Sequence, residues 1–317
     1  MKFSVTIPAY KRTFLKECID SILSQTFKDF EIIIVDDASP EKLNEVVSEY
    51  NDSRIHYYKN DRNCGAVDVV DNWNKCLEYA NGDYFICMGD DDRLSPNCLE
   101  VYSKLIEKKP GLGLYHAWTE IINEESITYD LQDPRPLYES ALSLLWNRWS
   151  YRSKQYIGDF LFDTQNLKEN GGFVKFPLAW SSDDMSAVIA ATKGGCANTQ
   201  EVCFQYRVNK QTISNTGNNV LKVQALAQYK EYIQRYLSLV DVNRLSETDL
   251  IYYNLLTTNI DSYFRRRYYY HISWDIRLNP LRFFYWLRNC DDYGLTKYSY
   301  VKLLIKSVIY VFDKRNM

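Results

Sequence analysis

The sequence lacks the cysteine and histidine patterns that usually hold zinc. Its eight cysteines are scattered without a Cys-x-x-Cys pair, and the three histidines do not accompany them at ligand spacing. No Gly-x-x-x-x-Gly-Lys-Ser/Thr loop is present, and no Gly-x-Gly-x-x-Gly follows the first apolar run. These absences argue against a zinc protein, a P-loop NTPase and a dinucleotide-dependent enzyme.

Long hydrophobic runs are also missing. No window reaches the roughly 18 apolar residues of a membrane-spanning helix, and the first apolar run is too short for a signal peptide. The net charge of -3 provides no basic footprint for nucleic acid. With 46% hydrophobic and 25% charged residues, the 317-residue chain has an ordinary globular composition. We therefore expect a cytoplasmic protein that does not bind nucleic acid.

Strand and helix patterns alternate in the N-terminal part of the chain. Four short apolar runs predict strands, at residues 3–7, 31–35, 54–58 and 84–88. Helical spacing or a Ser-Pro start predicts helices, at residues 14–25, 40–50, 66–80 and 96–108. This alternation predicts βαβ units, and hence an α/β fold with a doubly wound, mostly parallel sheet.

Helical periodicity dominates the last third of the chain. Apolar residues form one stripe over residues 226–237 and another over residues 301–312. We expect an N-terminal α/β domain over residues 1–216 and a helical, tyrosine-rich C-terminal region over residues 217–317.

Two acidic clusters follow predicted strands. Asp90, Asp91 and Asp92 come directly after the fourth strand, and Asp36-Asp37 ends the second. Ligands of α/β sheets bind outside the carboxyl ends of the strands, so both clusters are expected at one crevice. Adjacent carboxylates repel one another, and a divalent cation such as Mg²⁺ or Mn²⁺ would relieve that repulsion. The alternatives are a solvated turn for the triplet and a turn-capping role for one member of the pair.

A third acidic pair, Asp183-Asp184, precedes an apolar helical segment. The structural interpretation is that acids at a helix N-terminus complement the helix dipole. The functional interpretation is a general base that accepts the proton of an attacking hydroxyl. A carboxylate is the better candidate for a base because His56, His116 and His271 form no recognisable triad.

Arg207 stands alone after the apolar run at residues 202–204, where a strand would end. It is a candidate for binding a diphosphate. An ordinary surface arginine is the alternative interpretation.

Several short motifs follow one another in the N-terminal half, at Phe3–Arg12, Ser21–Phe27, Asp29–Ser39, Asn63–Gly65, Asn81–Tyr84 and Asp90–Asp92. Their order resembles that of the family 2 inverting glycosyltransferases, which have the GT-A fold. The resemblance is strong over roughly residues 1–110 and weak over residues 170–215. Each motif alone is weak, but the set is specific.

The resemblance implies a nucleotide site. Pro8, Ala9 and Tyr10 would line the nucleoside pocket, and Asp37 would contact the base. Asp90 would lie toward the diphosphate or the ribose. Uridine is the base that the resemblance favours.

The resemblance also implies a metal ion and a catalytic base. Mn²⁺ or Mg²⁺ would be held by Asp91, with Asp92 beside it. Asp184 would occupy the catalytic position, next to Asp183.

The sequence departs from the family pattern at three positions. Gly89 stands where the metal motif usually has its first Asp, which puts ribose contact and metal affinity in question. Trp73 replaces an Arg of the third helix, so that nucleotide contact is lost. Asn209 stands where a His is common, so any role of that His is absent.

We therefore expect an inverting glycosyltransferase that moves a sugar from a nucleotide diphosphate donor to a glycan or lipid-linked acceptor, in polysaccharide or glycan biosynthesis. The alternatives are a sugar nucleotidyltransferase and a non-catalytic binding protein of GT-A type. Aromatic and cationic residues mix at 265–288. Such segments can lie on the inner face of an anionic membrane as a peripheral contact. The structural alternative is a helical subdomain that packs on the core or forms a homodimer.

Overall fold

The chain forms two compact units. The computed structural model describes residues 1–209 and 218–289 and, beyond them, positions 293, 294, 296, 298, 301 and 305. The first unit comprises Met1–Lys175 and Ser182–Asn215, and the second comprises Phe176–Ser181 and Thr216–Met317. The second unit therefore includes a short segment, 176–181, that interrupts the first.

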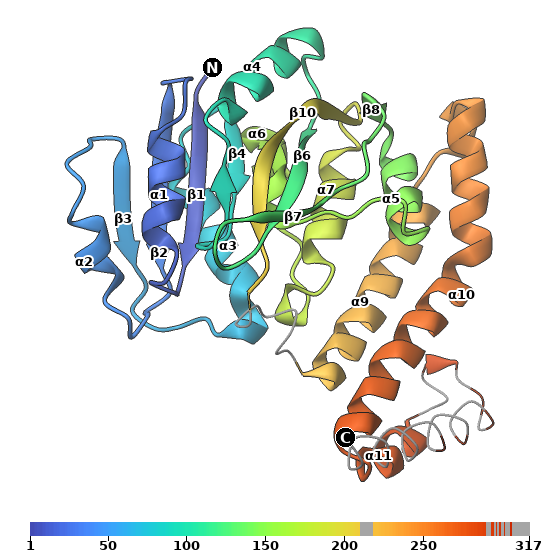
Figure 1. The fold of residues 1–317 in the computed structure, drawn as a ribbon. Coiled ribbons are helices and arrows are strands. Elements are labelled where there is room, and N and C mark those ends of the chain that lie inside the picture. The colour runs from blue at the N-terminus through green and yellow to red at the C-terminus, as the bar shows by residue number, and fades with distance from the viewer. Residues whose placement is uncertain are drawn as a thin grey trace. The chain divides into compact units, whose positions relative to one another are not determined.

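A mixed sheet forms the centre of the first unit (Figure 1). Its strands are β1 (Phe3–Ala9), β2 (Phe30–Asp36), β3 (Ile55–Lys59), β4 (Tyr84–Cys87), β5 (Arg93–Leu94), β6 (Leu114–Ile122), β7 (Thr128–Leu131), β8 (Tyr138–Glu139), β9 (Phe160–Asp163) and β10 (Cys196–Arg207). The strand order is β3-β2-β1-β4-β9-β6-β10-β5, with β7 beside β6 and β8 beside β10. Strands β3, β2, β1 and β4 are mutually parallel, and β10 is parallel to β6. The predicted α/β fold with a mostly parallel sheet is confirmed.

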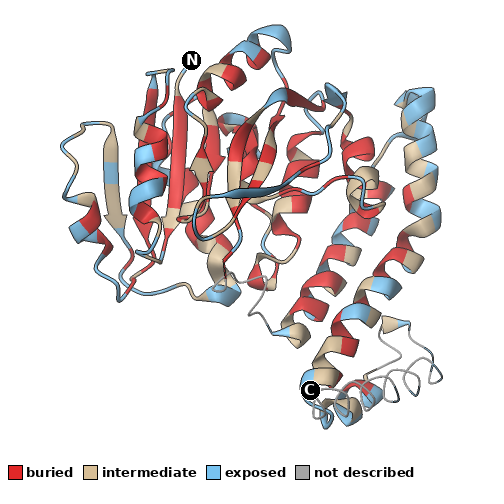
Figure 2. Ribbon diagram, in the orientation of Figure 1, coloured by how far each residue is buried: buried red, intermediate tan, exposed pale blue. Residues whose placement is uncertain are grey.

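Helices cover both faces of this sheet. The helices of the first unit are α1 (Leu15–Leu23), α2 (Leu43–Val47), η1 (Ala66–Asp68), α3 (Val69–Tyr79), α4 (Cys98–Lys108), α5 (Ala141–Trp149), η2 (Ile157–Asp159), α6 (Thr164–Glu169) and α7 (Ser182–Ala190). Successive strand residues point to opposite faces. Ile86 of β4 joins the core formed with α1 and α4. Its neighbour Phe85 contacts Phe173, which packs against Trp73 of α3. The strands of this sheet are largely buried (Figure 2).

Two local features differ from the predicted boundaries. Strand β1 continues through Pro8, because its ladder with β4 ends at Thr6 and the missing N–H of proline breaks no bond there. Helix α2 begins at Leu43 rather than at Ser39-Pro40. Ser39 instead donates through its hydroxyl to the carbonyl of Tyr10 at 2.6 Å, so it stabilises a turn and not a helix start.

The second unit is helical. It contains η3 (Pro177–Ala179), α9 (Asn219–Ser238), η4 (Val242–Arg244), α10 (Glu247–Leu278) and α11 (Arg282–Arg288). Helices α9 and α10 pack along each other, and Nζ of Lys230 lies 2.7 Å from a carboxylate oxygen of Asp261. The apolar stripe predicted over residues 226–237 is buried in this packing, apart from the half-buried Tyr236. The stripe predicted over residues 301–312 lies outside the described residues except at positions 301 and 305. Within the described part of the chain, no helix is both long enough and apolar enough to cross a membrane.

Candidate active site

The carboxyl ends of β1, β2 and β4 lie at one edge of the sheet, and hydrogen bonds connect the residues that follow them. Oδ2 of Asp90 accepts from the backbone N–H groups of Tyr10 and Lys11, both at 2.7 Å. The backbone N–H of Asp37 donates to the carbonyl of Ala9 at 2.9 Å. The structure therefore brings the predicted nucleotide-binding residues of these three strands together.

The three residues predicted to line a nucleoside pocket differ in exposure. Ala9 is fully buried and Pro8 is half-buried, whereas Tyr10 is 41% exposed. Of the three side chains, that of Tyr10 is therefore the most accessible to a ligand at this edge.

Asp36 and Asp37 have different surroundings. Asp36 is fully buried and accepts from the N–H of Ser39 at 2.7 Å and from the hydroxyl of Tyr57 at 2.5 Å. It therefore has the turn-capping role that the sequence left open. Asp37 accepts from the side-chain amide of Asn60 at 2.9 Å, which holds its carboxylate at the strand end.

The aspartates at 90–92 form, with Gly89, a tight segment that we call the acidic turn. Asp91 accepts from the side-chain amide of Asn209 at 2.5 Å. Asp92 uses Oδ1 for the N–H of Arg207 at 3.0 Å, and Oδ2 for a backbone N–H of the turn itself at 3.2 Å. Burial raises the pKa of Asp90 to about 6, and the charge of Asp91 adds to that rise. The same two causes raise the pKa of Asp92 well above its usual range. Negative charge is thus concentrated where a cation would stabilise it.

Gly89 is required by the packing of the acidic turn. A Cβ atom at this position would lie 2.8 Å from Oδ1 of Asp91 and 3.0 Å from Oδ2 of Asp92. Any side chain here, including the aspartate usual in the family motif, would displace both carboxylates from their present positions.

A pocket of about 290 Å³ opens over the acidic turn, lined by Lys11, Thr13, Phe14, Asp90, Asp91, Glu124 and Asn209. Mg²⁺ is commonly held by one or two carboxylates together with substrate phosphates. Asp91 and Asp90 face this pocket and fit such an ion. Asp92 is not among its lining residues and accepts a backbone N–H at each carboxylate oxygen, so its role as a metal ligand stays a prediction. Among the described residues, no three His, Cys, Asp or Glu side chains form a complete metal site.

Arg207 is fully buried beneath this turn. Its Nε donates to the carbonyl of Asp91 at 2.8 Å, and Nη1 donates to the carbonyl of Asn123 at 2.9 Å. Nη2 donates to the carboxylate of Glu17 at 2.9 Å, and the guanidinium lies over the ring of Phe14 at 4.1 Å. The predicted diphosphate contact is therefore wrong for this structure, because the guanidinium is directed at protein groups and holds the acidic turn in place.

We expect Arg207→Met to lower the free energy of unfolding by about 3 kcal/mol, because several buried carbonyls lose a charged donor. Urea unfolding measures this loss. Arg93→Met is the matched control, since Arg93 also approaches Glu17, at 3.8 Å, but is 35% exposed. The control should lose less than about 1 kcal/mol. Equal losses in the two variants would contradict the structural role of Arg207.

Asp184 lies in the first turn of α7 and is almost fully buried. Its Oδ1 accepts from Nε of Arg148 at 2.8 Å and from the side-chain amide of Gln155 at 2.7 Å. These two contacts hold the carboxylate of Asp184 in place. That Asp184 is the base stays a prediction.

Asp183 has the properties expected of a general base. It keeps part of its surface exposed, whereas Asp184 does not. Burial of its carboxyl, and then the charge of Asp184, raises the pKa of Asp183 to about 7, while Arg148 lowers it. A carboxylate with a pKa near neutrality can take up a proton and release it again.

Tyr206 of β10 links the acidic turn to Asp183. Its ring stacks on that of Tyr156 with centroids 3.6 Å apart. Burial raises the pKa of the Tyr206 hydroxyl, and so do the charges of Asp92, Asp91 and Asp183. Arg207, next to Tyr206, donates its N–H to Asp92, and Gln155, next to Tyr156, donates to Asp184. The stacked tyrosines therefore lie between the acidic turn and the start of α7.

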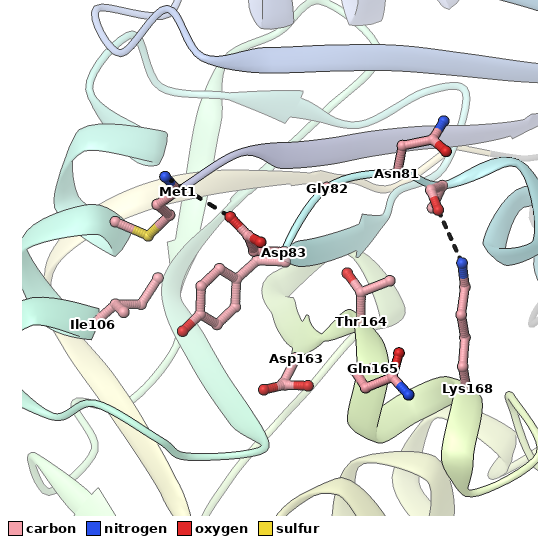
Figure 3. A pocket seen from close by; sticks show the side chains of 11 residues that line it. Met1, Asn81, Gly82, Asp83, Ile106, Asp163, Thr164, Gln165 and Lys168 are labelled. Carbon is pink, nitrogen blue, oxygen red and sulfur yellow. Dashed lines mark hydrogen bonds and ion pairs between the residues drawn. The ribbon is translucent and has the colours of Figure 1, made fainter.

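A separate hollow of about 800 Å³ lies near the amino ends of β1 and β4, lined among others by Asp83, Asp163, Thr164 and Lys168 (Figure 3). Lys168 donates to the carbonyl of Ala80 at 2.9 Å there. Ligands of α/β sheets bind outside the carboxyl ends of the strands. This hollow is therefore distinct from the site at the acidic turn.

Several residues that build the site are not indicated by the sequence. Arg148 and Gln155 hold Asp184, and Asn60 holds Asp37. Each comes from a loop or helix far along the chain from its partner. Asn209 is the exception, since its position shortly after Arg207 marked it as part of a motif.

The family was tested by comparison with known proteins. The model of "Glycosyl transferase family 2" matches residues 4–165. The chain belongs to this family. Among its curated relatives are glycosyltransferases of Methanocaldococcus jannaschii, 36% identical over 126 residues, and of Rickettsia typhi, 33% identical over 125 residues; neither has been characterized. These matches cover 38% and 39% of this chain, and 42% and 38% of the respective relatives. The chain thus matches about two fifths of the length of these family 2 relatives.

Solved structures show the same fold over more of the chain. S. aureus TarS 1-349 in complex with UDP-GlcNAc superimposes with a TM-score of 0.56 at 15% identity, covering 92% of this family 2 chain and 89% of TarS. The complex of the same protein with UDP gives a TM-score of 0.53 at 16% identity, with the same coverage. The predicted GT-A-type fold with a helical C-terminal region is therefore confirmed.

Proposed function

We propose that this protein is an inverting glycosyltransferase that moves a sugar from a uridine diphosphate donor to a hydroxyl group of a glycan or lipid-linked acceptor. The observation that carries the proposal is the stacked pair Tyr206–Tyr156, whose chain neighbours Arg207 and Gln155 bond to the acidic turn and to the start of α7. Membership of family 2 and the solved complexes of TarS with UDP and UDP-GlcNAc support the choice of donor.

Asp183 would act as the base of the transfer. Its carboxylate accepts the proton of the acceptor hydroxyl while that oxygen attacks the anomeric carbon from the side opposite the leaving diphosphate. In-line attack needs one base and no covalent intermediate, so the configuration inverts. Asp184 would act through Asp183, because its ion pair with Arg148 fixes the first turn of α7 and its charge raises the pKa of Asp183.

The nucleotide would bind at the edge formed by β1, β2 and β4. Tyr10 offers an exposed ring beside Asp37, and Lys11 lines the pocket over the acidic turn, where an ammonium group would attract phosphate. Asp91 and Asp90 would hold Mn²⁺ or Mg²⁺, which when bound stabilises the negative charge of the diphosphate.

An activity assay separates this function from the alternatives. Incubation with UDP-sugars and Mn²⁺ should release UDP, through slow hydrolysis where no acceptor is present. Release of pyrophosphate from a sugar phosphate and a nucleoside triphosphate would instead show a nucleotidyltransferase. If neither reaction occurs with any donor, the protein is a non-catalytic binding protein of GT-A type.

We expect UDP with Mn²⁺ to stabilise the protein against heat. A ligand at 100 times its Kd adds about 2.7 kcal/mol to the free energy of unfolding, enough to raise Tm by several degrees. Differential scanning fluorimetry measures the shift, with ADP and GDP as controls that should give smaller shifts. Asp37→Asn should reduce the difference between UDP and the other nucleotides. Equal shifts for all three nucleotides with the parent protein would contradict a uridine-specific site.

A further inference from the structure

Charge is distributed very unevenly along the chain. Residues 265–317 contain eleven Lys and Arg but four Asp and Glu, whereas the whole chain has a net charge of -3. The C-terminal segment is thus strongly basic and the rest of the chain is acidic. A basic segment of this kind attracts an anionic partner.

The end of α10 and helix α11 carry exposed apolar side chains. Leu278 is 71% exposed, Leu281 is 76% exposed, Phe284 is 65% exposed and Leu287 is 38% exposed. We call these four residues the apolar tip. They lie within ten consecutive positions, from the last residue of α10 through α11. Large apolar side chains gathered on a surface in this way mark an interaction site.

Trp286 fixes the direction in which the apolar tip points. Its ring is fully buried, and its Nε1 donates to Asp275 of α10 at 2.7 Å. Residues three or four apart share a helix face. Leu281, which directly precedes α11, and Phe284 are five and two positions from Trp286, so they do not share its buried face, and both are exposed. The buried Trp286 thus fixes α11 in place and leaves the side chains of the apolar tip exposed.

Arginines accompany the apolar tip. Arg277 and Arg282 are half-buried and lie on either side of the turn between α10 and α11. Arg288 is exposed at the end of α11. Arg282 lies over the ring of Tyr285 at 5.7 Å. In the described part of this region, from 265 to 289, the acidic residue is Asp275, which accepts from Trp286 and lies 4.0 Å from Nε of Arg282.

We propose that the apolar tip and its arginines bind the surface of an anionic lipid bilayer. Apolar side chains would enter the boundary between headgroups and acyl chains, while the arginines contact the headgroup phosphates. The excess of positive charge over residues 265–317 would repel the same segment of a second copy and attract anionic headgroups, so it favours a bilayer over self-association. This inference stands apart from the proposed sugar transfer, because it depends on the second unit alone.

Cosedimentation of the full chain with vesicles tests this proposal. We expect binding to vesicles of 70% phosphatidylcholine and 30% phosphatidylglycerol in 0.1 M NaCl, and at least tenfold weaker binding to pure phosphatidylcholine. The double variant Leu281→Ser/Phe284→Ser should bind the anionic vesicles at least tenfold less than the parent. Arg282→Gln/Arg288→Gln should lose the preference for anionic vesicles.

Leu239→Ser is the matched control, because Leu239 is 76% exposed and follows α9 in the same unit. It should bind vesicles as the parent does, and equal Tm values should show that all variants are folded. Recovery of the parent in the supernatant with both vesicles would overturn the proposal, as would unchanged binding of the Leu281→Ser/Phe284→Ser variant. A dimer in sedimentation velocity that this double variant dissociates would assign the apolar tip to a second copy and would also overturn it.

Discussion

Asp183→Asn is expected to reduce sugar transfer by about 10²- to 10⁴-fold, the usual contribution of a positioned general base. The amide has nearly the shape of the carboxylate but cannot accept the acceptor's proton. Affinity for the nucleotide should stay close to that of the parent, since Asp183 belongs to α7 and not to the strand ends that would hold the nucleotide. Measured release of UDP from a UDP-sugar, together with calorimetric binding of UDP, separates the two effects. Transfer at the parent's rate would remove Asp183 from the mechanism.

The pH dependence gives a sharper test of the same assignment. A base works only when deprotonated, so kcat/KM should rise with pH up to the pKa of Asp183, about 7, and then level off. The charge of Asp184 raises this pKa, so Asp184→Asn should move the rise of kcat/KM to lower pH, while loss of the ion pair with Arg148 lowers the plateau at high pH. Arg148 lowers the pKa, so Arg148→Met should move the rise to higher pH. If Asp184 and Arg148 had a purely structural role, the two substitutions would change the rate. They would not move the pH at which kcat/KM rises in opposite directions.

The alternating strands and helices could be predicted from the sequence because parallel strands covered on both faces read as continuous apolar runs. Strand β2 and helix α1 lie where the pattern put them. The start of α2 could not be predicted in the same way. The Ser39-Pro40 pair has the form of a helix start, but the carboxylate of Asp36 and the carbonyl of Tyr10 bind Ser39 and keep it in a turn. Tertiary partners here outweigh the local signal.

For the site, too, the features set by local sequence could be predicted and those set by remote partners could not. That acidic residues would follow strand ends is a local property, and the topology of the sheet then brings Asp37 and Asp90 to one edge. Which member of an acidic pair is free to react depends on partners that are remote in sequence. Asp184 binds Arg148 and Gln155, which are 36 and 29 positions away in the sequence, and these contacts are one ground for proposing Asp183 as the base. The pattern alone could not distinguish the two aspartates in this way.

Asp91→Asn is expected to weaken the binding of UDP in the presence of Mn²⁺ by at least tenfold, and to remove most of the difference between binding with and without the ion. The reason is that Asp91 offers a carboxylate to the pocket over the acidic turn, where the diphosphate would supply further oxygen ligands. Isothermal titration of UDP at fixed Mn²⁺, and again with a chelator present, measures both quantities. Stability should change little, because the amide can still take part in the contact with Asn209.

Asp92→Asn is the control that separates metal binding from the shape of the turn. Asp92 is buried, and both of its oxygens accept from backbone N–H groups. An amide offers one accepting oxygen, so one backbone N–H loses its partner, at about 1–3 kcal/mol of stability. The two neighbouring substitutions should thus have opposite signatures: lost ion-dependent binding in a stable protein for Asp91, and lost stability for Asp92. Equal affinity for UDP with and without Mn²⁺ in the parent would contradict the assignment of Asp91, because no ion-dependent contact would then remain to be lost.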